Sequence, residues 1–67
     1  MEWFLTAEVL PEPNTYLFGK RTKKNINHVY LFYNGKHFIK VNHENQYDYT
    51  FEPKKFQVWR PYSPGEP

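Results

Sequence analysis

The clearest pattern of apolar and polar positions lies on either side of Asn34-Gly35. Residues 27–33 and 36–42 are short runs rich in β-branched and aromatic residues, and Asn-Gly between two such runs is the strongest local signal for a β-hairpin. A two-residue turn there makes Tyr33 oppose Lys36, and opposed residues share one face of the ribbon. The first face then carries Val29, Leu31, Tyr33, Lys36, Phe38 and Lys40, and the second carries His28, Tyr30, Phe32, His37, Ile39 and Val41.

Both faces of this hairpin are therefore apolar, although a ribbon on the outside of a small protein needs only one apolar face. One face is expected to be core. The second face is expected either to be covered by other parts of the chain, or to contact a partner or a second copy of the chain.

The first half of the chain predicts two more strands. Residues 3–10 alternate as a half-buried strand does, with a short helix as the alternative because Ala, Leu and Glu are good helix formers. Residues 15–22 predict the next strand, in which Gly19 marks a bulge or a tight bend.

The second half is more polar. Residues 43–55 predict a loop with a short irregular strand, whose alternation places Tyr47, Tyr49 and Phe51 on one side. Residues 56–60 predict either a strand or a helical turn that begins at Pro53.

Four or five short strands with a turn signal about every ten residues predict an all-β fold. We expect a small antiparallel barrel or bent meander over residues 1–60, of the size of SH3-like and oligonucleotide-binding barrels, followed by an exposed Pro-rich tail over 61–67. An α+β fold with a short helix at one end is the alternative. The comparison with these barrels rests on the number of strands alone, and no sequence motif links the chain to either family.

The composition shows how so short a chain could be stabilised. The chain has 67 residues and no cysteine, which excludes disulfides and Cys-based zinc sites, but 21% of its residues are Phe, Trp or Tyr. Large rings bury much area on a short chain. No apolar run approaches the length of a membrane span, and the acidic N-terminus does not match a signal peptide. We expect a cytoplasmic protein, in its own cell or in a host.

Charge is distributed in blocks, although the net charge is only +2. Residues 13–43 hold six bases and no acid, whereas residues 1–12 hold three acids and no base. Basic residues interleaved with rings are typical of single-stranded nucleic-acid binders, because bases stack on rings while cations meet phosphates. The leading hypothesis is therefore binding of RNA or single-stranded DNA. The candidate binding residues are Lys20, Arg21, Lys23, Lys24, His28, Tyr30, Phe32, Lys36, His37 and Lys40.

The alternative hypothesis is a small inhibitor or accessory protein, of the kind that phages and mobile elements encode, which binds a host protein. Exposed aromatic residues rimmed by charge suit a protein interface equally well. A homodimer seam on the second hairpin face is compatible with either hypothesis.

Enzymatic and metal chemistry find little support in the sequence. The three glycines are isolated and form no phosphate loop, and the spacing of His28, His37 and His43 matches no standard ligand pattern. We expect neither an enzyme nor a cofactor or metal. Pro61, Pro64 and Pro67 recur every three residues, as in a polyproline II helix, and an inert tail is the favoured interpretation of this repeat.

Overall fold

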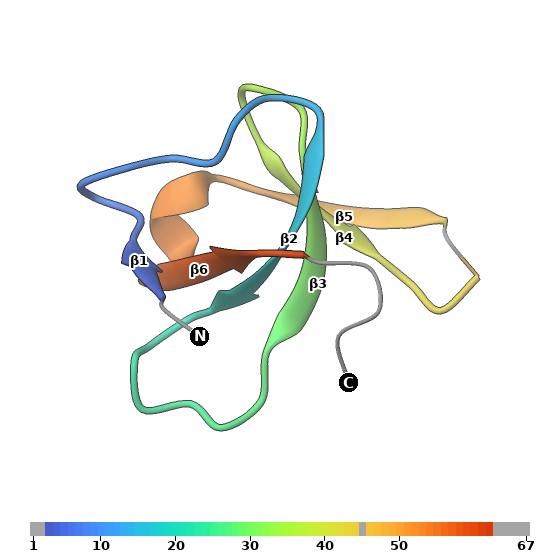
Figure 1. Cartoon of the computed structure of the whole chain (residues 1–67). Helices are drawn as coiled ribbons and strands as arrows, with labels where there is room; N and C mark the ends of the chain where they lie inside the picture. The colour runs from blue at the N-terminus through green and yellow to red at the C-terminus, as the bar shows by residue number, and fades with distance from the viewer. Residues whose placement is uncertain (1–2, 45, 63–67) are drawn as a thin grey trace.

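The computed structural model describes residues 3–44 and 46–62 of the chain. Its strands form one antiparallel sheet in the order β1-β6-β2-β3-β4-β5 (Figure 1). They are β1 (Phe4–Leu5), β2 (Thr15–Lys20), β3 (Val29–Tyr33), β4 (Phe38–Val41), β5 (Tyr47–Phe51) and β6 (Val58–Pro61), with one 3₁₀ turn, η1 (Pro53–Lys55).

The all-β class is confirmed. Among the described residues the only helical element is η1, so the α+β alternative is wrong. β1 and β5 end the sheet and do not pair with one another, so the sheet does not close into a barrel. Figure 1 shows that it is strongly bent.

The core lies on the face of the sheet that carries Leu17, Leu31 and Phe38, all three fully buried. These side chains follow the period-2 alternation that the sequence predicted for β3 and β4. The complete core cluster is Leu17, Leu31, Tyr33, Phe38, Phe56 and Trp59.

Gly19 lies in this core and not at a bulge or bend. Its strand pairs continuously, with Gly19 opposite Val29 on one side and Trp59 on the other. A Cβ atom at Gly19 would stand 2.8 Å from Leu31 Cδ1 and 3.1 Å from Phe56 Cδ1. The glycine is therefore explained by the close approach of Phe56 to β2.

The sequence predicted either a helical turn that begins at Pro53 or a strand over residues 56–60, and the structure contains both in succession. Pro53 begins η1, and the Phe56 N–H donates to the Pro53 carbonyl at 3.0 Å. This turn delivers Phe56, 1% exposed, into the core. The chain then extends into β6.

The strand predicted over residues 3–10 is largely wrong. Only Phe4 and Leu5 pair with β6. The chain then turns, because the N–H groups of Glu8 and Val9 both donate to the Leu5 carbonyl at 3.0 Å. The Trp59 indole N–H donates to the Val9 carbonyl at 2.8 Å and holds this turn against the sheet.

The hairpin is present, but its register is shifted by two residues. Tyr33 pairs with Phe38 rather than with Lys36. The turn centres on Gly35 (φ 95°), because the Asn34 side chain accepts the Lys36 and His37 N–H groups at 2.9 and 2.7 Å. A shift of two residues leaves every strand side chain on its predicted face.

The predicted alignment of Tyr47, Tyr49 and Phe51 on one side is wrong. Register shifts between Ile39 and Val41, so that β5 carries an extra residue opposite β4. A bulge re-aims the side chains that follow it. Tyr47 therefore stacks on Phe32, with ring centroids 5.5 Å apart, whereas Phe51 packs against the core.

The sheet also extends past residue 60. Pro61 belongs to β6 and pairs with Leu17, and the Tyr62 N–H donates to the Tyr16 carbonyl at 3.2 Å. The first residue of the predicted tail, Pro61, is thus part of the sheet, and the second, Tyr62, is hydrogen-bonded to its edge. Residues 63–67, with the rest of the proline repeat, lie outside the described part of the chain.

We predict that Gly19→Val destabilises the fold by about 1–3 kcal/mol, because the new side chain overpacks a buried site. Replacing glycine also reduces the conformational entropy of the unfolded chain, which stabilises the folded state. This effect is smaller, about 0.4–1 kcal/mol for a Gly→Ala change. Urea denaturation monitored by tryptophan fluorescence measures the change. Thr50→Val, on an exposed strand position, is the control. Equal stability of the two variants would contradict the packing account of Gly19.

Candidate functional site

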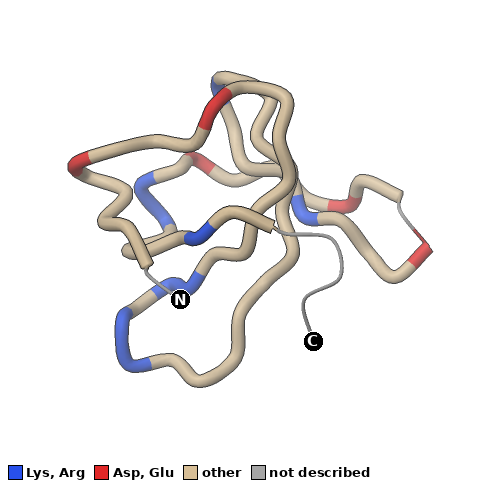
Figure 2. The backbone as a smooth tube through the Cα atoms, in the orientation of Figure 1, with Lys and Arg blue, Asp and Glu red and all other residues tan. Residues whose placement is uncertain are grey.

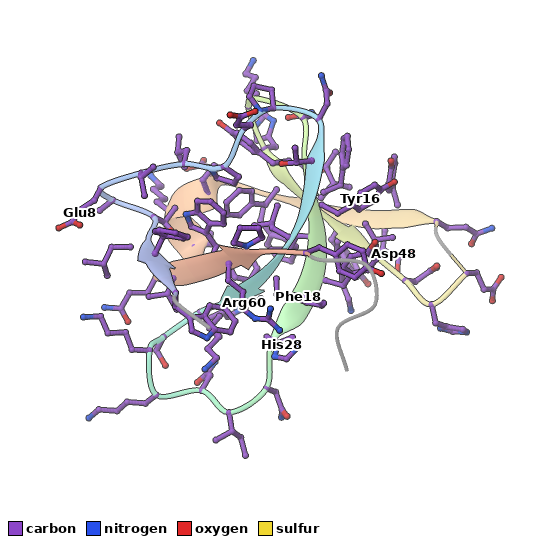
Figure 3. All side chains as sticks on the ribbon, viewed as in Figure 1. Glu8, Tyr16, Phe18, His28, Asp48 and Arg60 are labelled. Atoms are coloured by element: carbon purple, nitrogen blue, oxygen red, sulfur yellow. The ribbon has the colours of Figure 1, made fainter. Side chains whose placement is uncertain are left out.

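The second face of the sheet carries a continuous layer of rings. We call it the aromatic face and define it by Trp3, Tyr16, Phe18, His28, Tyr30, Phe32, Tyr47 and Tyr62, which are linked by ring contacts. It follows from alternation: Tyr16 and Phe18 alternate with the core residues Leu17 and Gly19 along β2. Figure 3 shows Tyr16, Phe18 and His28 along this surface, with Arg60 beside Phe18.

The centre of the aromatic face is a cluster across β2 and β3. The Tyr16 ring lies 5.0 Å from Phe32 and 5.5 Å from Tyr30, stacked on Tyr30 at an interplanar angle of 21°. Phe18 lies 5.6 Å from Tyr30. Such ring contacts stabilise a sheet in addition to the stabilisation that comes from burying apolar area.

Two exposed tyrosines extend this centre sideways. Tyr47 reaches in from β5, stacks on Phe32 and places its hydroxyl 3.4 Å from that of Tyr16. Tyr62, after β6, contacts Phe18 and Tyr30 at 5.6 and 5.3 Å. Tyr16 and Tyr62 are each 40% exposed and Tyr47 is 54% exposed. The layer therefore offers ring surface to a ligand.

One end of the aromatic face is cationic. The Arg60 guanidinium lies 4.9 Å from the Phe18 ring centroid and 5.5 Å from that of Trp3. The Lys20 ammonium lies 4.5 Å from the Trp3 centroid, and the His28 ring lies 4.7 Å from that of Phe18. Rings thus hold two cations and a histidine at the edge of the stacking surface.

The connection from β2 to β3 continues this basic end. Lys23 and Lys24 are exposed there, and this connection is marked by basic (blue) segments at the lower left of Figure 2. The Lys23 N–H donates to Gln57 Oε1 at 2.9 Å, and the Asn25 N–H donates to the Thr22 carbonyl at 3.2 Å. The lysines are therefore carried on a hydrogen-bonded turn.

The structure brings together six of the ten predicted candidates. Lys20, Lys23 and Lys24 lie at the basic end, and Tyr30 and Phe32 lie in the centre of the aromatic face. His28 joins these two groups, since its ring contacts both Phe18 and Trp3.

The other four candidates lie elsewhere. Lys36 and His37 are in the β3–β4 connection, at the opposite end of β3. The Lys40 ammonium lies 5.8 Å from the Tyr49 ring, and the Arg21 guanidinium lies 5.5 Å from the Phe51 ring. Tyr49 and Phe51 contact one another and are outside the aromatic face.

Six residues of this surface were absent from the candidates that the sequence suggested: Trp3, Tyr16, Phe18, Tyr47, Arg60 and Tyr62. Alternation along β2 carries a usable signal, because Tyr16 and Phe18 fall on the side opposite Leu17. Arg60 and Tyr62 could not be assigned without knowing that β6 pairs with β2.

No group of three His, Asp or Glu side chains with metal-binding geometry occurs among the described residues. His28 contacts rings, and His43 lies 3.7 Å from Glu44 on an exposed loop. Nor do the described residues include a helix long and apolar enough to cross a membrane.

Two tyrosines of the aromatic face, Tyr30 and Tyr47, have raised pKa values. Burial, followed by the proximity of Tyr62 and Tyr16, raises the pKa of Tyr30 above its ordinary value of 10.0. The hydrogen bond with Tyr16 is the main cause that raises the pKa of Tyr47. In both cases the folded state favours the neutral phenol.

We therefore predict that stability falls in alkali. The unfolded chain releases these protons near pH 10 while the folded chain retains them, so the free energy of unfolding declines as pH rises from 10.0 through the raised pKa values. Tyr30→Phe should make this decline shallower, whereas Tyr49→Phe, outside the aromatic face, should not. Urea denaturation at a series of pH values measures both. Identical pH profiles for Tyr30→Phe and the parent would contradict the prediction.

Function has to be inferred from the residues of this surface. Comparisons of the chain with protein-family models, with curated proteins and with solved structures each give no match.

Proposed function

We propose that the aromatic face binds single-stranded nucleic acid, RNA or single-stranded DNA. The observation that carries the proposal is the continuous layer of partly exposed rings, with cations held at one end by Trp3 and Phe18. A binding role of this kind needs neither a cofactor nor a catalytic group. It fits the cytoplasm of the protein's own cell or of a host.

Stacking supplies the first part of the interaction. Bases stack on aromatic side chains regardless of sequence, because every base has a flat face. Tyr47, Tyr16 and Tyr62 have the exposure that stacking needs. Phe18 and Phe32 lie between them and are half-buried, so they support the exposed rings from below.

Phosphate contacts supply the second part. Lys20 and Arg60 lie against the rings, and Lys23 and Lys24 lie on the adjoining connection. A strand whose bases lie on the aromatic face can run its backbone past these four cations. Duplex DNA is a poorer ligand, since its bases are already stacked and the rings have nothing to contact.

A protein partner on the same surface is the second candidate. Ile26 is 90% exposed beside the basic turn, and an exposed aliphatic side chain contributes nothing to a phosphate contact. Tyr, Trp and Arg are also the residues enriched at the energetic centres of protein interfaces. This candidate corresponds to the small inhibitor or accessory protein considered from the sequence.

We predict that Tyr47→Ala weakens binding to an oligonucleotide of about 15 nucleotides at low salt by about 1 kcal/mol or more, roughly fivefold or more in Kd, because one stacking ring is lost. Tyr49→Ala is the matched control: Tyr49 is on the same strand and is also exposed, but it is outside the aromatic face. Fluorescence anisotropy with labelled single-stranded RNA and DNA measures both. Absence of binding by the parent protein at low salt would remove the nucleic-acid proposal and favour the protein partner.

We further predict that binding weakens steeply with salt and that the double variant Lys23→Glu/Lys24→Glu reduces this dependence. Two lost phosphate contacts lower the slope of log Kd against log salt by about 1.4 for a single strand. Lys54→Glu/Lys55→Glu, on η1, makes the same change of net charge away from the aromatic face and should alter binding far less. Salt-independent affinity of the parent would be incompatible with the proposal.

A further inference from the structure

A groove opens at the end of β2 opposite the basic turn. Its volume is about 470 Å³, and we call it the Trp59 groove. It lies between the connection that precedes β2 and the end of β6. Its lining residues are Pro11, Glu12, Thr15, Tyr16, Trp59, Pro61 and Tyr62.

The Trp59 groove offers flat apolar surfaces and few polar groups. Trp59 is 6% exposed and its indole N–H is already bonded to the Val9 carbonyl, so it presents to the groove only a small area of ring and no free polar group. Tyr16 and Tyr62 are members of the aromatic face, where both contact Tyr30, and they also line this groove. Two prolines complete the lining.

The backbone around the groove argues against a strand as occupant. Pro61 has no N–H to give to an added strand. The Tyr62 N–H already donates to the Tyr16 carbonyl at 3.2 Å. An occupant that needs no backbone partner fits better. A polyproline II segment is such an occupant, and its pyrrolidine rings pack on aromatic side chains.

Charge favours a basic occupant and disfavours a phosphate. Glu12 is the one charged side chain among the described residues that line the groove, and it is exposed. Residues 6–14, which form this side of the molecule, hold Glu8 and Glu12 and no base. Lys36 is the nearby exception, because a Cβ atom added at its neighbour Gly35 would stand 3.3 Å from Pro13 Cβ, but Lys36 does not line the groove.

We propose that the Trp59 groove binds a proline-rich segment of a partner protein that carries an Arg or Lys next to its prolines. The prolines lie against Trp59, Tyr16 and Tyr62, and the basic side chain meets Glu12. The groove is separate from the basic end of the aromatic face, but Tyr16 and Tyr62 belong to both surfaces. A peptide in the groove and a nucleic acid on the aromatic face therefore compete for these two rings.

The test uses a synthetic peptide of six prolines flanked by arginines, titrated into a Trp3→Phe variant in which Trp59 is the remaining tryptophan. Binding should change Trp59 fluorescence in a saturable way. Peptides in which glycine and serine replace the prolines, or glutamates replace the arginines, should bind at least fivefold more weakly.

Matched charge reversals then locate the contact. Glu12→Lys should weaken binding about fivefold, whereas Glu8→Lys, an equal change on the same connection but outside the lining, should stay within twofold. Circular dichroism checks that both variants fold. The proposal is overturned if the proline peptide gives no saturable change, or if both reversals act alike. It is equally overturned if a single-stranded oligonucleotide, and not the peptide, produces the Trp59 signal, because the groove would then belong to the nucleic-acid site.

Discussion

The structure depends on the contact of Phe56 with β2 at Gly19. A chain of 67 residues without cysteine has to close its core by packing alone. The absence of a side chain at Gly19 lets Phe56 approach within van der Waals distance of the strand and meet Phe38 and Phe51, at 5.8 and 5.4 Å between ring centroids. The bend of the sheet and the short η1 turn both serve this contact.

With the core closed on one side, no second layer of described residues covers the other side of the sheet. The rings there are held by one another and by cations rather than by a second sheet or helix. Tyr33 and Tyr30 show the difference, since alternation along β3 places Tyr33 in the core at 5% exposure and Tyr30 among the rings of the aromatic face. Aromatic residues on both faces of the hairpin therefore have two separate explanations, one structural and one proposed to be functional.

Local pattern was sufficient to predict the class of fold, the hairpin and the face of each of its strand residues. It failed where a side chain bonded to the backbone of its own turn, and where one residue depended on another strand. The Asn34 side chain moved the turn by bonding to Lys36 and His37, and the bulge in β5 separated Tyr47 from Phe51. The lack of space for a side chain at Gly19 depended in part on Phe56, far along the chain. Arg60 was missed for the same reason, since only strand pairing reveals which rings it meets.

The position of β6 in the sheet bears on how the protein is made. β6 is the last strand of the described chain, yet it lies between β1 and β2, the first two (Figure 1). During synthesis on the ribosome, β1 has no neighbour to pair with until β6 has left the exit tunnel. The hairpin of β3 and β4 can form early, but the sheet is completed only after nearly all of these residues are released. Such dependence on distant pairing slows folding, and it leaves the aromatic residues of the nascent chain open to chaperones until then.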